Sequence, residues 1–345
     1  MGVLISTPYD DENAFGAMEL TAGINFIQPT YGLLLPSGLF NPVGVSTKTI
    51  SIEMVNNQLQ LLETKPEDGD ANLSTQEERS MVTFKIPHIP LRDTIRPSEF
   101  SGIRAFGGTE LDHAHNVMEK KSLKNRRRFE LTWEHLMWGA LKGEIIDGDG
   151  SRVLFNLYDK FEVTKKVIDF ELHNPKTDVD GKCEEIVAHV ERYLQGDTMT
   201  EVVCRVSPEF FRLLITHPNV EKFYLAQSGA AKLVGASFKA FVFGNVRFEV
   251  YRGQAPTSKG VQRRFINPGE GIAYPEGTYE TFGGAWGPGE FMDTVNTEGI
   301  PIYARRKVLD FDKGLDLYYE SNPIFLCMRP QVLVTVTAGE EFEIP

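Results

Sequence analysis

The chain has 345 residues, 41% of them hydrophobic and 24% charged, which is ordinary for a soluble folded protein with a sizeable core. Its formal net charge of -12 argues against wholesale coating of nucleic acid, which needs a net basic surface. No apolar run is long enough to span a membrane, and the first residues lack a secretory signal pattern, so we expect synthesis in a cytoplasm.

Residues 1–50 do not have the pattern of a compact domain. Short apolar pieces, Ile24–Ile27 and Leu33–Leu35, alternate with turn signals that contain proline. Such a segment cannot bury enough surface by itself. The sequence therefore predicts either an arm that lies on another surface or a partly disordered segment.

Residues 51–90 predict an extended hairpin. A run with strand alternation comes first, Met81–Ile89 is a second strand candidate, and residues 64–80 between them are rich in Glu, Asp, Gly and Ser. A hairpin with a long charged tip has little core of its own and is marginally stable in water. It needs a partner surface, and another chain is one candidate.

From Glu110 to Ile146 the sequence predicts one helix, uninterrupted by proline and roughly 50 Å long at about 1.5 Å per residue. Globular helices average about three turns, so a helix of this length is predicted to be a structural spine. Its second half is apolar, and Phe129, Trp133 and Met137 follow one face, which predicts packing against a core. Its middle carries six basic residues: Lys120, Lys121, Lys124, Arg126, Arg127 and Arg128.

Three interpretations of this basic run stay open. Six cations on a helix can contact a phosphate backbone without reading its sequence, or they can contact another subunit. Alternatively, they form a solvated face that pairs with Glu119, Glu130 and Glu134 at helical spacings.

The chain after the helix predicts short strands and a second domain. Asp147–Gly150 is a turn signal, and strands are expected at Arg152–Asn156 and Phe161–Phe170. A domain of mixed helix and strand is predicted from Cys183 to about residue 310, and the strands after it are expected to return to the first domain.

Two local signals inside the predicted second domain are specific. Ser207-Pro208 is a helix start, with a serine cap and proline in the first turn. Gly244-Asn245 lies between two alternating runs and predicts a plain hairpin.

No catalytic, cofactor or metal site emerges from the residues. His113 and His115 point about 200° apart on a helix and cannot share a metal ion. The run Gly283–Gly289 lacks the Lys-Ser/Thr of a phosphate-binding loop and is predicted to be a flexible loop. The cysteines have no metal-site spacing and are predicted to be buried as small apolar residues: Cys183, Cys204 and Cys327.

Three stretches around the predicted helix are distinctive: RPSEF at Arg96–Phe100, RRRFELT at Arg126–Thr132 and LKGEI at Leu141–Ile145. The tail, with Leu315–Tyr319 followed by Ser321–Leu326, fits the same layout. Together with the order of the elements, these stretches resemble the lambda-type major capsid proteins of tailed bacteriophages, the capsid protein E family. The resemblance covers most of the chain in layout, but only these stretches in residues.

The resemblance implies an α+β protein with the HK97-like (Johnson) capsid fold. It implies an N-terminal arm at 1–50, an extended loop (E-loop) at 51–90, a peripheral domain with the spine helix at 91–182, an axial domain at 183–310 and a C-terminal return to the peripheral domain at 311–345. The implied function is that of a structural, non-catalytic major capsid protein without cofactors. Such a protein self-assembles into hexamers and pentamers that form an icosahedral shell around double-stranded DNA.

The resemblance also implies partners and a location. Besides further copies of itself, these are a portal, a decoration protein and genomic DNA bound non-specifically, with no membrane. Nothing before residue 50 resembles the helical scaffolding segment of some relatives, so a separate scaffolding protein is implied. The protein is expected in the virion capsid after synthesis in the bacterial cytoplasm. The alternatives are a cytoplasmic hydrolase with a site built from sequence-distant residues, and another virion subunit such as a tail or connector protein.

Overall fold

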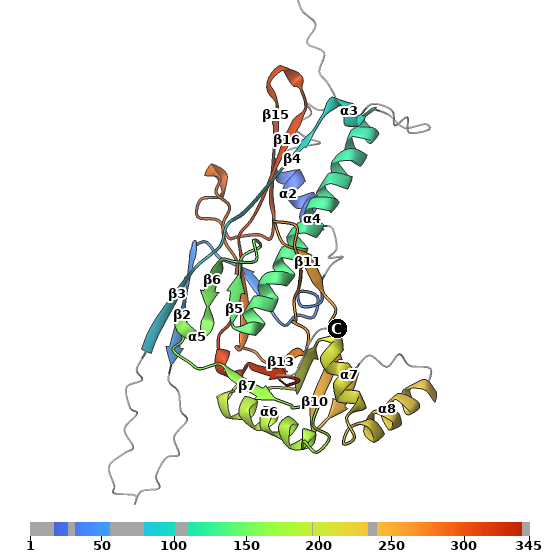
Figure 1. Cartoon of the computed structure of the whole chain (residues 1–345). Coiled ribbons are helices and arrows are strands. Elements are labelled where there is room, and N and C mark those ends of the chain that lie inside the picture. Colours follow the sequence, from blue (N-terminus) through green and yellow to red (C-terminus); the bar gives the residue numbers. More distant parts are fainter. Residues whose placement is uncertain are drawn as a thin grey trace, which may run out of the picture. The chain divides into compact units, whose positions relative to one another are not determined.

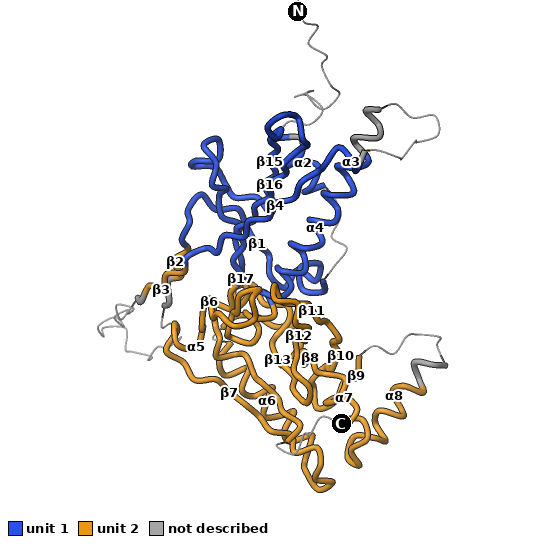
Figure 2. Tube along the Cα trace, turned by 45° about the horizontal axis from the view of Figure 1, so that its top comes forward, with its two compact units in different colours: residues 1–49, 85–137, 283–325 blue, residues 50–84, 138–282, 326–345 orange. Residues whose placement is uncertain are grey.

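The computed structural model describes residues 17–26, 32–55, 79–100, 110–194, 196–233 and 240–339. The chain forms two compact units, and each unit combines segments that are far apart in the sequence (Figure 2). Unit 1 consists of residues 1–49, 85–137 and 283–325. Unit 2 consists of residues 50–84, 138–282 and 326–345.

Unit 1 contains a three-stranded antiparallel sheet in the order β15-β16-β4. The central strand β16 (Leu315–Ser321) pairs with β15 (Tyr303–Val308) on one side and with β4 (Ile89–Ile95) on the other. The short helix α2 (Ala17–Phe26) contacts β15. Part of the predicted arm is therefore a helix that packs on a sheet.

A second three-stranded sheet contains β1 (Pro42–Gly44), β14 (Phe282–Trp286) and β17 (Pro323–Cys327), with β1 parallel to β14. The predicted flexible loop over Gly283–Gly289 is therefore wrong in its first half, which is a central strand. Glycine is needed there because a Cβ on Gly284 would lie 2.8 Å from the Ile324 carbonyl oxygen of the neighbouring strand.

The long helix α4 runs from Glu110 to Lys142 and ends before the predicted Ile146 (Figure 1). Gly143 ends it, because its φ of 74° lies in the left-handed region that favours glycine. A Cβ at this position would also lie 2.3 Å from the ring of Tyr158. The chain then enters a hairpin of β5 (Glu144–Ile146) and β6 (Val153–Asn156).

The strands β2 (Thr49–Val55) and β3 (Arg79–Lys85) form a separate two-stranded sheet, which supplies both strands of the predicted hairpin. The charged stretch between them lies outside the described residues. Phe84, near the end of β3, is fully buried, and its ring lies 5.4 Å from that of Phe155 and 5.9 Å from that of Phe161. The root of the hairpin is therefore anchored by aromatic contacts within unit 2.

Unit 2 is built on a six-stranded sheet whose order is β7-β18-β13-β8-β10-β9. In that order the strands are Lys166–Asp169, Val334–Thr337, Glu270–Glu276, Glu201–Val206, Val246–Val250 and Ala240–Phe243. Strand β18 pairs in parallel with β7 and antiparallel with β13. The structure thus divides the chain differently from the expected boundaries at 182 and 311, because pairing between distant strands places β7 and β18 in the sheet of β8 and β10.

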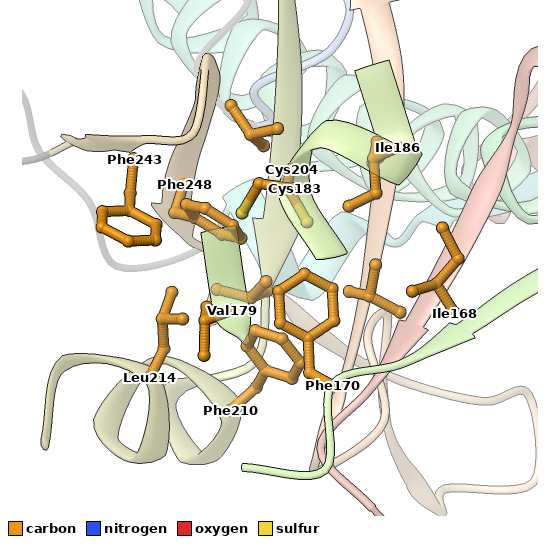
Figure 3. Packing of buried hydrophobic residues seen from close by; sticks show 14 of the residues in the cluster. Ile168, Phe170, Val179, Cys183, Ile186, Cys204, Phe210, Leu214, Phe243 and Phe248 are labelled. Atoms are coloured by element: carbon orange, nitrogen blue, oxygen red, sulfur yellow. The ribbon is translucent and has the colours of Figure 1, made fainter. Parts of the chain in front are cut away.

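Helices α6 (Val179–Tyr193) and α7 (Pro208–Thr216) pack on one face of this sheet. The apolar face of α6 repeats at helical spacing and meets aromatic side chains from the sheet and from α7 (Figure 3). The Phe170 ring lies 5.5 Å from that of Phe210 and 6.4 Å from that of Phe248, both edge-on. This cluster is the core of unit 2.

Both local signals of this region are confirmed. Ser207 caps α7, and its hydroxyl accepts a hydrogen bond from the Phe210 N–H. The two-residue turn Gly244-Asn245 joins β9 to β10, and both residues have a positive φ, as this hairpin type requires. The helix α8 (Glu221–Leu233) follows α7.

The remaining elements are short: α3 (Pro97–Phe100), α5 (Leu157–Lys160), β11 (Gln254–Pro256), β12 (Gln262–Arg264), η1 (Met292–Thr294), η2 (Asp310–Asp312) and η3 (Pro330–Val332). The described part of the chain contains no helix with the length and apolar character needed to cross a membrane.

The basic segment of the long helix

The six basic residues of α4 do not share one environment. Four of them are exposed. At 100° per residue these four fall within an arc of about 100° of the helix surface. We call this set the basic stripe: Lys120, Lys124, Arg127 and Arg128.

Lys121 is turned toward other elements of unit 1. Its Nζ lies 3.2 Å from Asp93 Oδ1 on β4 and 3.1 Å from Glu99 Oε2 on α3, and its side chain is 19% exposed. Burial by itself lowers the pKa of Lys121, but hydrogen bonds and charge from Glu99 and Asp93 outweigh it and raise the pKa. Lys121 is therefore an internal cation that holds α4 against β4 and α3.

Arg126 is buried and also has internal partners. Its Nε donates to Glu130 Oε1 at 2.8 Å, one turn along the same helix, and the side chain of Glu130 is only 1% exposed. A second guanidinium nitrogen, Nη1, donates to the Ile24 carbonyl of α2. The predicted pairing with Glu130 is present, but the pair is buried rather than solvated.

The apolar face of the helix, as far as Met137, lies inside unit 1. Phe129, Trp133 and Met137 are buried. Trp133 donates its indole N–H to Ser321 Oγ on β16 at 3.1 Å, and its ring lies 4.8 Å from that of Trp286 on β14. Trp133 therefore contacts both sheets of the unit, through a hydrogen bond to β16 and an aromatic contact to β14.

Glu134 has a role that the sequence pattern did not reveal. It is buried, and its Oε2 accepts hydrogen bonds from the main-chain N–H groups of Leu33 and Leu34, each at 3.1 Å. The carboxylate thus fixes a turn within the predicted arm onto α4. No local signal could have shown this, since the partners lie about a hundred positions earlier in the chain.

The described residues contain neither a metal site nor an activated thiol. No group of three or more His, Cys, Asp or Glu side chains among them could hold a metal ion. All three cysteines are buried, as predicted, and burial raises the pKa of the Cys327 thiol to about 12. A thiol with so high a pKa is not an activated nucleophile.

The sequence matches a known protein family over nearly its whole length. The model of the family described as phage major capsid protein E matches residues 16–338. The chain belongs to this family. It is 30% identical to the major capsid protein of Salmonella phage Felix O1, over 95% of this chain and 97% of that protein. It is 29% identical to the major capsid protein of Pseudomonas phage KPP10, over 94% and 97%.

Solved structures show the same fold. A proposed capsid protein of a prophage in Escherichia coli CFT073 matches with a TM-score of 0.61 at 16% identity, covering 94% of this chain and 99% of that one. The mature capsid of bacteriophage PhiM1 matches with a TM-score of 0.53 at 11% identity, covering 92% and 90%. The predicted α+β, HK97-like capsid fold is confirmed.

Family membership also settles the broad function. The chain is a structural subunit of a phage capsid shell and not an enzyme. The two alternatives, a hydrolase and a tail or connector subunit, are therefore wrong.

Proposed function

We propose that this capsid subunit self-assembles into hexamers and pentamers that close into an icosahedral shell around double-stranded DNA. The observation that supports closed assembly is the β2–β3 hairpin. Its root is anchored through Phe84, yet among the described strands β2 and β3 pair only with each other, and Met81 is 70% exposed. An isolated two-stranded sheet is marginally stable, so this hairpin is suited to lie on a neighbouring copy as an E-loop.

In this proposal the two units take different roles. Unit 1, with most of α4 and the β15-β16-β4 sheet, is the peripheral part of the subunit. The six-stranded sheet of unit 2 is the axial part, which surrounds the hexamer and pentamer centres. Residues 1–50 act as the arm, and the buried Glu134 ties this arm to α4 through the main chain at Leu33 and Leu34.

The basic stripe is the surface for the genome. Its four exposed cations lie on one side of α4, so they can follow a phosphate backbone without contact to base edges. The protein as a whole carries a net charge of -12, which keeps this attraction local. The competing use of the stripe is an inter-subunit contact with acidic side chains of another copy.

Further partners follow from the same role. We propose a separate scaffolding protein that directs assembly, a portal at one vertex and a decoration protein that reinforces the finished shell. Synthesis takes place in the cytoplasm of the bacterial host. Family membership supports these partners as a class.

Deletion of Lys65–Ser80 tests the assembly role of the hairpin. The variant should remain soluble and folded, because Phe84 and its aromatic contacts are retained, but it should form no closed particles. Negative-stain electron microscopy of the overexpressed chain gives the result, and near-ultraviolet circular dichroism checks the fold. A variant with the same stretch replaced by Gly and Ser residues of equal number separates loop length from loop chemistry. Normal shells from the deletion would contradict the proposal.

A further inference from the structure

Among the strands that the structure describes, β9 lies at one edge of the six-stranded sheet and pairs with β10 alone (Figure 2). Phe243 and Val246 face each other across the two-residue turn, so the main-chain groups of Phe243 and Phe241 point toward β10. Those of Val242 and Ala240 point to the free edge. A free strand edge is a ready template for pairing with another chain.

One side chain occupies this edge. Gln227 of α8 donates its Nε2–H to the Val242 carbonyl oxygen at 2.7 Å, and its Oε1 accepts the Val242 N–H at 3.3 Å. The side-chain amide thus offers one donor and one acceptor, as the peptide group of a pairing strand does. Gln227 satisfies the Val242 groups that a further strand would use.

A similar arrangement closes an edge in unit 1. Thr21 Oγ1 of α2 donates to the Ala304 carbonyl at 3.1 Å and accepts the Ala304 N–H at 3.0 Å, on the edge strand β15. Asn25 of the same helix donates to the Ile302 carbonyl at 2.8 Å. In each unit, polar side chains of a helix take the place of a strand.

The surroundings of β9 favour an added strand. Val242 is 48% exposed, and Phe223, one turn before Gln227 on α8, is 57% exposed and packs edge-on against Phe243. A strand that paired here would bury this apolar surface as well as gain main-chain hydrogen bonds. As a shell subunit, the chain meets its own copies at high local concentration.

We propose that the β9 edge is a strand-pairing surface for β9 of a second copy of this chain, and that Gln227 keeps it closed. Two copies would pair antiparallel about a twofold axis through Val242, which is a self-complementary contact. Such a dimer fuses two sheets and removes subunits from ordered assembly. Gln227 is therefore a guard against wrong association, and its role is independent of the hairpin and the basic stripe.

The test replaces the guard in the unassembled full-length chain. Gln227→Ala should speed amide hydrogen exchange at Val242 about tenfold, since two hydrogen bonds are lost, while exchange at the buried Phe248 stays unchanged. Sedimentation velocity should show dimers that grow with protein concentration. The matched control is Lys222→Ala, an exposed change on the same helix, which should stay monomeric.

A double variant separates an open edge from general loss of stability. In Gln227→Ala/Val242→Lys the added lysine places like charges opposite each other across the dimer axis, so dimers should disappear although the edge is still uncovered. Disappearance of the dimers would support the proposal. A Gln227→Ala variant that stays monomeric at every concentration would overturn it, and so would dimers that persist in the double variant.

Discussion

The substitution Arg126→Ala tests whether the basic residues of α4 are divided into buried and exposed ones. Removing the guanidinium leaves the Glu130 carboxylate, 1% exposed, without this cation. Removing one partner of a buried ion pair lowers the free energy of unfolding by roughly 3–5 kcal/mol, and the lost hydrogen bond to the Ile24 carbonyl adds about 1 kcal/mol to this loss. We expect the free energy of unfolding to fall by about 5 kcal/mol, a large part of the roughly 5–15 kcal/mol of a typical domain. The exposed neighbour Arg127→Ala should cost at most about 1 kcal/mol.

Urea unfolding of the unassembled chain measures both variants. Tryptophan fluorescence reports mainly on unit 1, because two of the three tryptophans, Trp133 and Trp286, are buried against each other there. The double variant Arg126→Met/Glu130→Leu should be less destabilised than Arg126→Ala, since no buried charge remains. If Arg126→Ala and Arg127→Ala lowered the free energy of unfolding equally, the division of the basic run into buried and exposed residues would be refuted.

Two further predictions concern the basic stripe and Asp197. Replacing all four residues of the basic stripe by glutamine should reduce the slope of log K against log salt for double-stranded DNA by about 3 to 4, whereas a slope that the substitutions leave unchanged would point to an inter-subunit role. Asp197 accepts hydrogen bonds from the Tyr279 and Glu280 N–H groups and the Thr281 hydroxyl, which outweigh burial and lower its pKa. Because the pKa is lowered, the ionised carboxyl stabilises the fold above the unfolded pKa of about 4, and this stabilisation is lost as the pH falls below that value. Asp197→Asn should therefore flatten the loss of stability below about pH 4 in urea titrations.

Elements with local signals could be predicted from the sequence. The Ser207-Pro208 cap and the Gly244-Asn245 turn depend on neighbouring residues only, and both are present. The pairing of β18 with β7 could not be predicted, because the two strands lie far apart in the sequence and neither has a residue pattern that identifies the other as its partner. The strand at Phe282–Trp286 was missed for a related reason: its glycines suit close contact with Ile324, which no local rule distinguishes from a loop.

The basic segment shows the same limit. The positions of the basic stripe could have been read from helical spacing, because i, i+4, i+7 and i+8 lie on one side. The burial of Lys121 and Arg126 could not, since their partners Asp93 and Ile24 come from other segments of unit 1. Counting charges in the sequence therefore overestimates the number of exposed cations by two, Lys121 and Arg126.

Taken together, the strand edges constrain how copies of this chain meet. Every open edge is an equal template for pairing, so a shell subunit with several open edges would associate in several ways. Helix side chains cover Val242 on β9 and Ala304 on β15. The β2–β3 hairpin, in contrast, has no such cover within the part of the chain that the structure describes. In the proposed assembly, closing β9 and β15 while leaving the hairpin available would direct contact to the hairpin, because a correct shell requires the wrong edges to be less available than the right surface.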